Sequence, residues 1–289
     1  MLRAGGGGTG LNTIYAVMDA LLPVEAMQFT FMKHALLAIL LLTPLLGLLG
    51  TMAVNQQMAF FSDALGHSAL TGIGLGIILG VGSDLVSMLV FGILWAALII
   101  LIRHRAQTSA DTVISVCSST SVAAGLLILS RGGGFAKYSS LLIGDVLAVG
   151  QEDLLYLLLA LIGGVILWCY MYNALLLTGI NASLARSRGI HTILVETAFA
   201  ILVAVAVMLS IRWVGVMLIN ALLILPAAAG RNVARSTRQH AFFSVIFAVM
   251  SGVMGLFSSY LWDTSAGAAI VLYAAAIYAV TLLIRRTRR

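Results

Sequence analysis

Long apolar runs, separated by short polar segments, occupy the chain from residue 35 to residue 284. A helix that spans a membrane needs about 20 mostly apolar residues. On that criterion the sequence predicts eight to nine spanning helices, or about ten if part of the N-terminal segment also crosses the bilayer. The expected spans are residues 35–54, 60–82, 85–102, 112–130, 153–177, 193–212, 214–230, 241–261 and 265–284.

The first 34 residues follow a different pattern from the rest of the chain. Gly5 to Gly8 form a flexible run, and residues 12–32 mix apolar positions with Asp19 and Pro23. They lack the unbroken apolar core and small-residue cleavage site of a secretory signal peptide. We expect residues 1–34 to be a flexible lead-in with a short helix at the membrane face, followed by one transmembrane domain over residues 35–289.

Composition supports this division. Of 289 residues, 61% are hydrophobic and only 9% are charged, and the mean hydropathy is +1.09. An ordinary soluble domain carries about 25% charged residues. The chain is therefore not a soluble enzyme, a nucleic-acid-binding module or a disordered protein, and the expected fold is an all-α, polytopic transmembrane helical bundle surrounded by lipid. Cys117 and Cys169 both occur in apolar surroundings without metal-ligand spacing, so both are expected in the core.

The basic residues predict an orientation. The 16 Lys and Arg residues concentrate in loops and at the C-terminus, and nine alternating spans place the four main groups on one side of the membrane. The positive-inside rule assigns that side, and the C-terminus with it, to the cytoplasm. Lys33 and His34 fall on the opposite side, which leaves the side of the N-terminus open. The four groups are residues 103–105, 186–191, 231–240 and 285–289.

Two ionisable residues in the second expected span form the best candidate site. Asp63 and His67 are four residues apart, so on a helix they lie on one face, one turn from each other. Ionisable groups inside a membrane are costly and mark a pathway by default. A carboxylate and an imidazole suit Zn²⁺, Mn²⁺ or Fe²⁺, and two ligands are too few for a permanent structural zinc site. The alternative is an Asp–His hydrogen bond that only packs two helices.

Other polar positions are weaker candidates for a pathway or a gate. Asp145 follows an irregular glycine-rich stretch, where ion entry competes with helix capping as an explanation. Asn220 precedes Pro226 in the seventh expected span. A proline removes one helical hydrogen bond and bends the helix, which is compatible with a hinge or with a static bend.

Glu196 stands near the start of the sixth expected span. It either reaches back to the membrane interface or pairs with Arg186 or Arg188. We favour this structural role over a role in the pathway.

Residues 179–191 form a basic loop that is too polar to span the membrane. Asn181 is suited to cap a short helix there, and Gly189 is suited to end it. The loop is either a connector or a short helix that docks on a cytoplasmic partner. The chain has no G-x-x-x-x-G-K-[S/T] phosphate loop, so it binds no nucleotide by that device. Neither a G-x-S-x-G nor an H-E-x-x-H motif indicates a membrane hydrolase.

Three ordered blocks resemble the permease subunits of bacterial ABC importers for divalent metals, the zinc, manganese and iron family known as ABC-3. Residues 58–76 are similar to the family pattern S-D-A-x-x-H-A-x-x-P-G-x-A-x-G, with Thr71 in place of the usual proline. Residues 142–149 and 221–231 match two further blocks. The resemblance covers roughly residues 35–284 and agrees with the transmembrane domain expected from hydropathy.

The resemblance implies a homodimeric permease in the bacterial inner membrane, with ATPase subunits on its cytoplasmic face and an extracytoplasmic binding protein that delivers the metal. It implies that Asp63 and His67 handle the metal, that the chain holds no permanent cofactor, and that ATP hydrolysis takes place in the partner and not in this chain. It also implies that the loop 179–191 couples the permease to the ATPase. The expected coupling residues are Asn181, Leu184, Ala185, Arg186 and Gly189.

Asp and His accept Zn²⁺, Mn²⁺ and Fe²⁺ alike, so these residues do not name the metal. Zn²⁺ is the expected substrate, followed by Mn²⁺ or Fe²⁺. The main alternative is a gradient-driven secondary transporter that uses Asp63 and His67 as a proton relay; such folds often contain inverted repeats, and none is visible here. An intramembrane enzyme would need a catalytic constellation that the sequence does not show. A siderophore permease would need a wider, aromatic-lined path.

Overall fold

The computed structural model describes residues 15–16, 18–19, 25–106, 108–131, 144 and 146–287. Within these ranges every regular element is helical, which confirms the expected all-α class. In chain order the elements are η1 (Glu25–Gln28), α2 (Thr30–Asn55), α3 (Phe61–Ile78), α4 (Asp84–Arg105), α5 (Ala110–Arg131), η2 (Val146–Ala148), α8 (Gln151–Ile180), α9 (Ala182–Ser187), α10 (Thr192–Val214), α11 (Val216–Val233), α12 (Thr237–Trp262) and α13 (Ala266–Thr287).

Eight helices of the described chain are long and apolar enough to cross a membrane: α2, α4, α5, α8, α10, α11, α12 and α13. They correspond to eight of the nine expected spans. The ninth, α3, has 18 residues, as many as α11, and carries Asp63, His67 and several glycines; it is not among the eight. Helix α2 begins at Thr30, inside the expected lead-in. Most of that lead-in, residues 1–14 and 20–24, lies outside the described residues.

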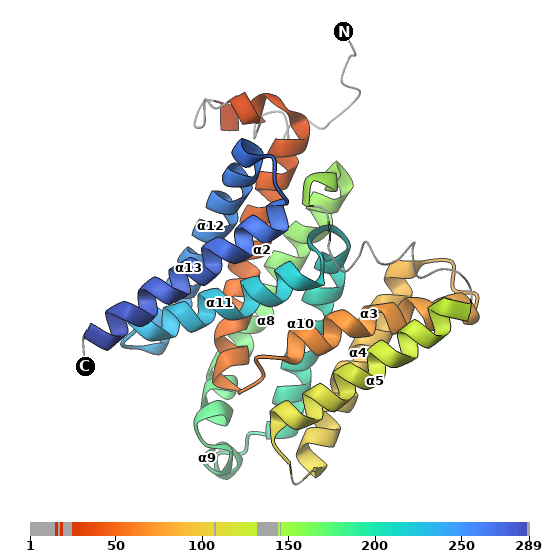
Figure 1. Cartoon of the computed structure of the whole chain (residues 1–289). Helices are drawn as coiled ribbons and strands as arrows, with labels where there is room; N and C mark the ends of the chain where they lie inside the picture. The colour runs from red at the N-terminus through yellow and green to blue at the C-terminus, as the bar shows by residue number, and fades with distance from the viewer. Residues whose placement is uncertain are drawn as a thin grey trace.

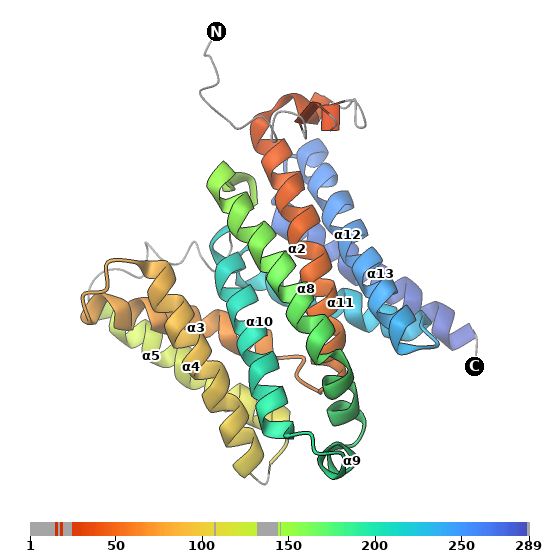
Figure 2. The same cartoon turned by 180° about the vertical axis from the view of Figure 1, so that it is seen from behind.

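The helices form two groups around α10 (Figures 1 and 2). On one side α2 packs against α8, α11 and α12, and α13 packs against α11 and α12. On the other side α3 lies against both α4 and α5, while α10 contacts α4, α3 and α8. The short helix α9 and the end of α13 lie toward the lower part of the molecule in Figure 1, and the start of α2 lies at the top.

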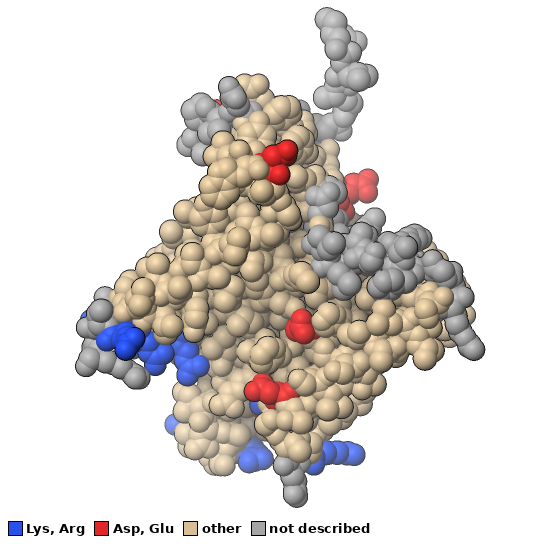
Figure 3. Space-filling view, in the orientation of Figure 1, with Lys and Arg blue, Asp and Glu red and all other residues tan. Residues whose placement is uncertain are grey.

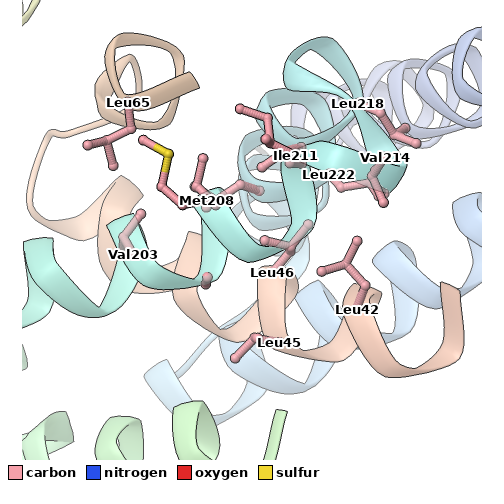
Figure 4. Close-up of a cluster of buried hydrophobic side chains, with 14 of the residues drawn as sticks. Leu42, Leu45, Leu46, Leu65, Val203, Met208, Ile211, Val214, Leu218 and Leu222 are labelled. Carbon is pink, nitrogen blue, oxygen red and sulfur yellow. The ribbon is translucent and has the colours of Figure 1, made fainter. Parts of the chain in front are cut away.

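The core lies where α2, α3, α10 and α11 meet. Figure 4 shows side chains of these four helices pointing toward one another, among them Leu46 of α2, Leu65 of α3, Met208 of α10 and Leu222 of α11, each 1% exposed or less. Helix packing within a membrane depends on close contact, because lipid tails are as apolar as the side chains. This cluster therefore sets where α3, the helix with the two ionisable residues, sits in the bundle.

The charged residues are distributed unevenly. In Figure 3 the visible Lys and Arg side chains lie in the lower half of the molecule, whereas the acidic side chains are spread from its upper end to its lower part. This agrees with the prediction that the basic loops share one side. Lys33 lies in the first turn of α2, away from this end, and its ammonium contacts the Asp19 carboxylate at 2.7 Å.

The prediction for one of the two cysteines is wrong. Cys117 is buried, as expected, but Cys169 on α8 is exposed. Only 22% of the most apolar 18-residue window of α8 is buried inside the chain. In a membrane protein an apolar sequence is equally suited to the core and to the lipid-facing surface, so hydropathy alone did not separate the two cysteines.

Candidate metal-binding site

Helix α3 brings the two predicted residues together near its start. The Nε2 atom of His67 lies 3.5 Å from Oδ1 of Asp63, and the two side chains are 32% and 43% exposed. The four-residue spacing produces this geometry, because such positions are neighbours on one helical face. Both side chains are thus accessible from outside this chain and point toward one another.

A third polar side chain completes the group. Asn220 of α11 donates a hydrogen bond from Nδ2 to Oδ1 of Asp63 over 2.6 Å. Its own Oδ1 is buried and has no hydrogen-bond partner within the described chain. The sequence marked Asn220 as a pathway candidate but gave no sign of its contact with a residue 157 positions away. Asn220 therefore fixes one carboxylate oxygen and leaves an amide oxygen free to accept.

Close contact between α3 and α11 makes this hydrogen bond possible. A Cβ atom at Gly66 would lie 2.4 Å from Cγ1 of Val216, so the absent side chain lets the start of α11 approach α3. Gly66 meets Val216 about one turn from the point where Asp63 meets Asn220. The two contacts run in opposite chain directions, so the helices cross antiparallel here.

Thr71 anchors α3 to the neighbouring helix α5. It is 4% exposed, and its hydroxyl donates a hydrogen bond to the backbone carbonyl of Ser121 on α5. A Cβ at Gly125 of α5 would lie 2.9 Å from the Thr71 nitrogen, so the two backbones are nearly in contact. Thr71 is one turn beyond His67, and thus it fixes the rotation of the helix that presents His67.

The donor set of this group is incomplete for a tightly held metal. Within the described chain no group of three or more His, Cys, Asp and Glu side chains is arranged to hold an ion. Asp63 and His67 offer one carboxylate and one imidazole. Permanent zinc sites usually have four protein ligands. The geometry is suited to an ion that takes its remaining ligands from water or from another chain.

The other two pathway candidates are placed as follows. Pro226 is buried inside α11, six positions after Asn220, and the helix continues beyond it to Val233, further than the expected end at residue 230. Asp145 lies outside the described residues. Its neighbour Gly144 has a φ of +70°, and a Cβ there would lie 2.2 Å from the nitrogen of Gly215, at the junction of α10 and α11.

Glu196 does not pair with Arg186 or Arg188, so that part of the prediction is wrong. Its carboxylate lies 3.0 Å from Nε2 of His104 and 3.4 Å from Nη1 of Arg103, and its side chain is 6% exposed. Both partners lie in the last turn of α4. Helix packing buries Glu196 between α10 and α4 and hides it from the loop cations, and this supports the structural role that we favoured.

The loop 179–191 contains a capped helix. Oδ1 of Asn181 accepts hydrogen bonds from the backbone N–H groups of Ser183 and Leu184, so Asn181 caps α9 as expected. Gly189, with a φ of +77°, follows its end. Leu184 is 43% exposed, whereas Ala185 is fully buried. Of these two, Leu184 is therefore the one available to a partner.

Eight apolar helices of spanning length in the described chain, with a half-exposed group of polar side chains among them, are typical of a multi-pass membrane protein. Comparison with known proteins agrees. The ABC 3 transport family matches residues 28–285, and the chain belongs to this family. It is a permease subunit of a transporter and not itself an enzyme.

Several relatives cover nearly the whole chain. The high-affinity zinc uptake system membrane protein ZnuB of Haemophilus influenzae is 30% identical over 259 residues, which are 89% of this chain and 99% of the relative. The manganese import system permease protein ScaB of Streptococcus parasanguinis is 27% identical over 91% of this chain and 93% of its own length. The structure of PsaBC from Streptococcus pneumoniae in complex with Fab has a TM-score of 0.77 and 26% identity, and the match covers 93% of this chain and 95% of that chain.

Proposed function

We propose that the chain moves a divalent transition metal, Zn²⁺ in preference to Mn²⁺ or Fe²⁺, into the cytoplasm, with Asp63 and His67 as its transient ligands. The observation that carries the proposal is the 3.5 Å approach of His67 Nε2 to Asp63 Oδ1 on an accessible helix face. The names of relatives that take up zinc or import manganese support it.

The chemistry of the group fits transit better than storage. A carboxylate and an imidazole replace part of the hydration shell that the cation loses inside a low-dielectric path. The amide of Asn220 orients the carboxylate, in the way that residues around a metal site commonly orient its ligands. Few protein ligands also mean weak retention, so the ion can leave again. Pro226 and Asp145 remain candidates for a gate or an entry point on this path.

A second copy of the chain completes the site in this proposal. Two exposed apolar side chains, Phe60 with 60% exposure and Met217 with 71%, flank the group in sequence. A two-fold homodimer that covers this face would bring a second Asp63 and a second His67 to the same ion. Two carboxylates and two imidazoles then make the four ligands that Zn²⁺ prefers.

Energy and delivery come from partners. ABC ATPase subunits dock on the end of the molecule that carries the basic residues, with α9 as the coupling element. Leu184 supplies its exposed apolar contact, Asn181 and Gly189 fix its ends, Ala185 seats it on the permease, and Arg186 stands in its last turn. That end and the C-terminus face the cytoplasm. A metal-binding protein docks on the opposite side and delivers the ion.

The experiment that tests this function separates it from a gradient-driven transporter. The permease, purified together with its ATPase subunits, is reconstituted into vesicles and supplied with Zn²⁺-loaded binding protein. We expect ⁶⁵Zn²⁺ accumulation that requires ATP and persists when proton and potential gradients are collapsed. Accumulation without ATP, driven by an imposed proton gradient, would instead support the Asp63–His67 proton relay.

A further inference from the structure

A groove between α8 and the start of α10 is not explained by metal transport. It is a cavity of about 920 Å³, and its lining includes Tyr170, Asn173, Ile180, Arg188 and Val195. In Figure 2 α8 lies in front of α11 and in Figure 1 behind it, and the last turns of α8 line the groove. It extends along the last turns of α8 to the loop after α9.

The length of the groove matches one leaflet of a bilayer. From Tyr170 to Ile180 the helix rises by about 15 Å at 1.5 Å per residue. Half of a hydrocarbon core that is about 30 Å thick has the same depth. Tyr170 and Ile180 are 87% and 78% exposed, on a spanning helix that is only 22% buried by its own chain. A membrane-spanning helix with such an apolar outer face is in contact with lipid.

The groove has positively charged side chains at its end near the loop after α9, which is called its mouth below. Arg188 lines it, and within the described chain no carboxylate lies within ion-pair distance of its guanidinium. An adjoining cavity of about 460 Å³ is lined by Arg186 and His191. None of the described residues that line the two cavities is acidic. The nearby carboxylate of Glu196 is already paired with α4. The mouth is therefore complementary to an anion.

The first turn of α10 adds a second feature that favours an anion. His191 precedes the helix and makes no side-chain capping hydrogen bond, and Thr192 and Leu194 line the adjoining cavity. The unpaired N–H groups and the helix dipole favour negative charge at this position. The backbone of Arg188 is held in place, since its N–H donates to the carbonyls of Leu184 and Ala185 over 3.3 and 3.2 Å.

We propose that this groove binds an anionic phospholipid of the cytoplasmic leaflet. Its phosphate lies between Arg188 and the start of α10, and an acyl chain follows α8 as far as Tyr170. Basic pockets between spanning helices on the cytoplasmic side are a recurrent way to hold anionic head groups. A lipid seated there contacts both α8 and α10, the helices on either side of the coupling helix α9.

The test compares lipids and variants on the complex of permease and ATPase. The purified complex is stripped of lipid with detergent and exposed to equal amounts of phosphatidylglycerol and phosphatidylcholine, and retained lipid is counted by native mass spectrometry. We expect preferential retention of phosphatidylglycerol. Arg188→Gln should reduce that preference roughly fivefold, the effect of losing one basic contact with an anionic lipid. Arg235→Gln, a matched change between α11 and α12 outside the groove, should leave it intact.

A second variant tests the apolar part of the groove. Ala174 also lines the cavity, and Ala174→Phe should reduce retention of both lipids by filling the space of the acyl chain. Equal retention of the two lipids by the unaltered complex would overturn the proposal, as would an unchanged preference in Arg188→Gln. Loss of ATPase subunits in Arg188→Gln, with lipid retention unchanged, would assign the groove to the ATPase. None of these results depends on which metal is transported.

Discussion

The Nδ2 atom of Asn220 lies 2.6 Å from Oδ1 of Asp63, and this hydrogen bond joins two helices whose residues are 157 positions apart. It links the first of the three blocks that carry the family resemblance to the residue directly before the third block. The carboxylate that would receive the metal is therefore held by α11 as well as by its own helix.

Asn220→Ala tests this link. Without the amide, Asp63 loses its orienting donor and pairs more readily with His67, which hinders metal binding. Removal of such a supporting group commonly costs about 10- to 100-fold in metal affinity or activity, so we expect a drop of that order in initial ⁶⁵Zn²⁺ uptake. Asn232→Ala is the matched control, because Asn232 lies on the same helix and contacts Thr281 and Arg285 instead. Equal uptake by the two variants would contradict the role of Asn220 in orienting Asp63.

Gly66→Ala tests the helix crossing. The added Cβ would lie 2.4 Å from Cγ1 of Val216, so α11 must shift away from α3, at a cost of about 1–3 kcal/mol. The shift weakens the contact of Asn220 with Asp63, so uptake should fall although no ligand is altered. Gly163→Ala is the control, because a Cβ at Gly163 on α8 meets nothing within 4 Å. It should leave uptake unchanged and slightly raise resistance to heat.

Thr71→Val tests how α3 is anchored to α5. Valine keeps the shape of threonine but loses the hydroxyl that bonds to Ser121. The loss of one buried hydrogen bond should lower stability by about 1 kcal/mol, measured as an earlier midpoint in a thermal aggregation assay of the detergent-solubilised protein. Thr71→Ser keeps the donor and should recover most of the loss. Thr120→Val on the exposed face of α5 serves as a control and should not change the midpoint.

Glu196→Ala should lower thermal stability more than any other single change considered above. It leaves Arg103 and His104 without the carboxylate that they share, and breaking a buried ion pair costs about 3–5 kcal/mol. Partial exposure of the two cations makes the lower end of that range the expectation. Glu152→Ala, at an exposed position in the first turn of α8, should have little effect. A Glu196→Ala protein as stable as the Glu152→Ala protein would contradict this ion pair.

The local sequence pattern was sufficient to predict the helices and the pairing of Asp63 with His67. Hydropathy marks each apolar run, and a four-residue spacing within one helix fixes a shared face without any knowledge of the rest of the fold. The cap at Asn181 was also predictable from the local sequence, since a cap depends on residues two and three positions away.

The features that the sequence did not predict all depend on how the helices pack against one another. The partners of Glu196 lie on α4, 92 and 93 positions earlier, whereas the nearby loop arginines were the plausible local choice. The contact of Asn220 with Asp63 depends on how closely α3 and α11 approach at Gly66. Exposure of Cys169 depends on which face of α8 is turned to the lipid. A single sequence does not reveal any of these features, because the packing of several helices determines them.

The central claim is that Asp63 and His67 bind the metal during transport. Its most direct test is the initial rate of ⁶⁵Zn²⁺ uptake by cells that depend on this transporter, with assembly checked by co-purification of the ATPase subunits. Asp63→Asn and His67→Ala should abolish uptake while the complex still assembles, and Asp263→Asn, a matched change at the end of α12 away from the site, should transport normally. Normal uptake by both the Asp63→Asn and the His67→Ala proteins would contradict the account.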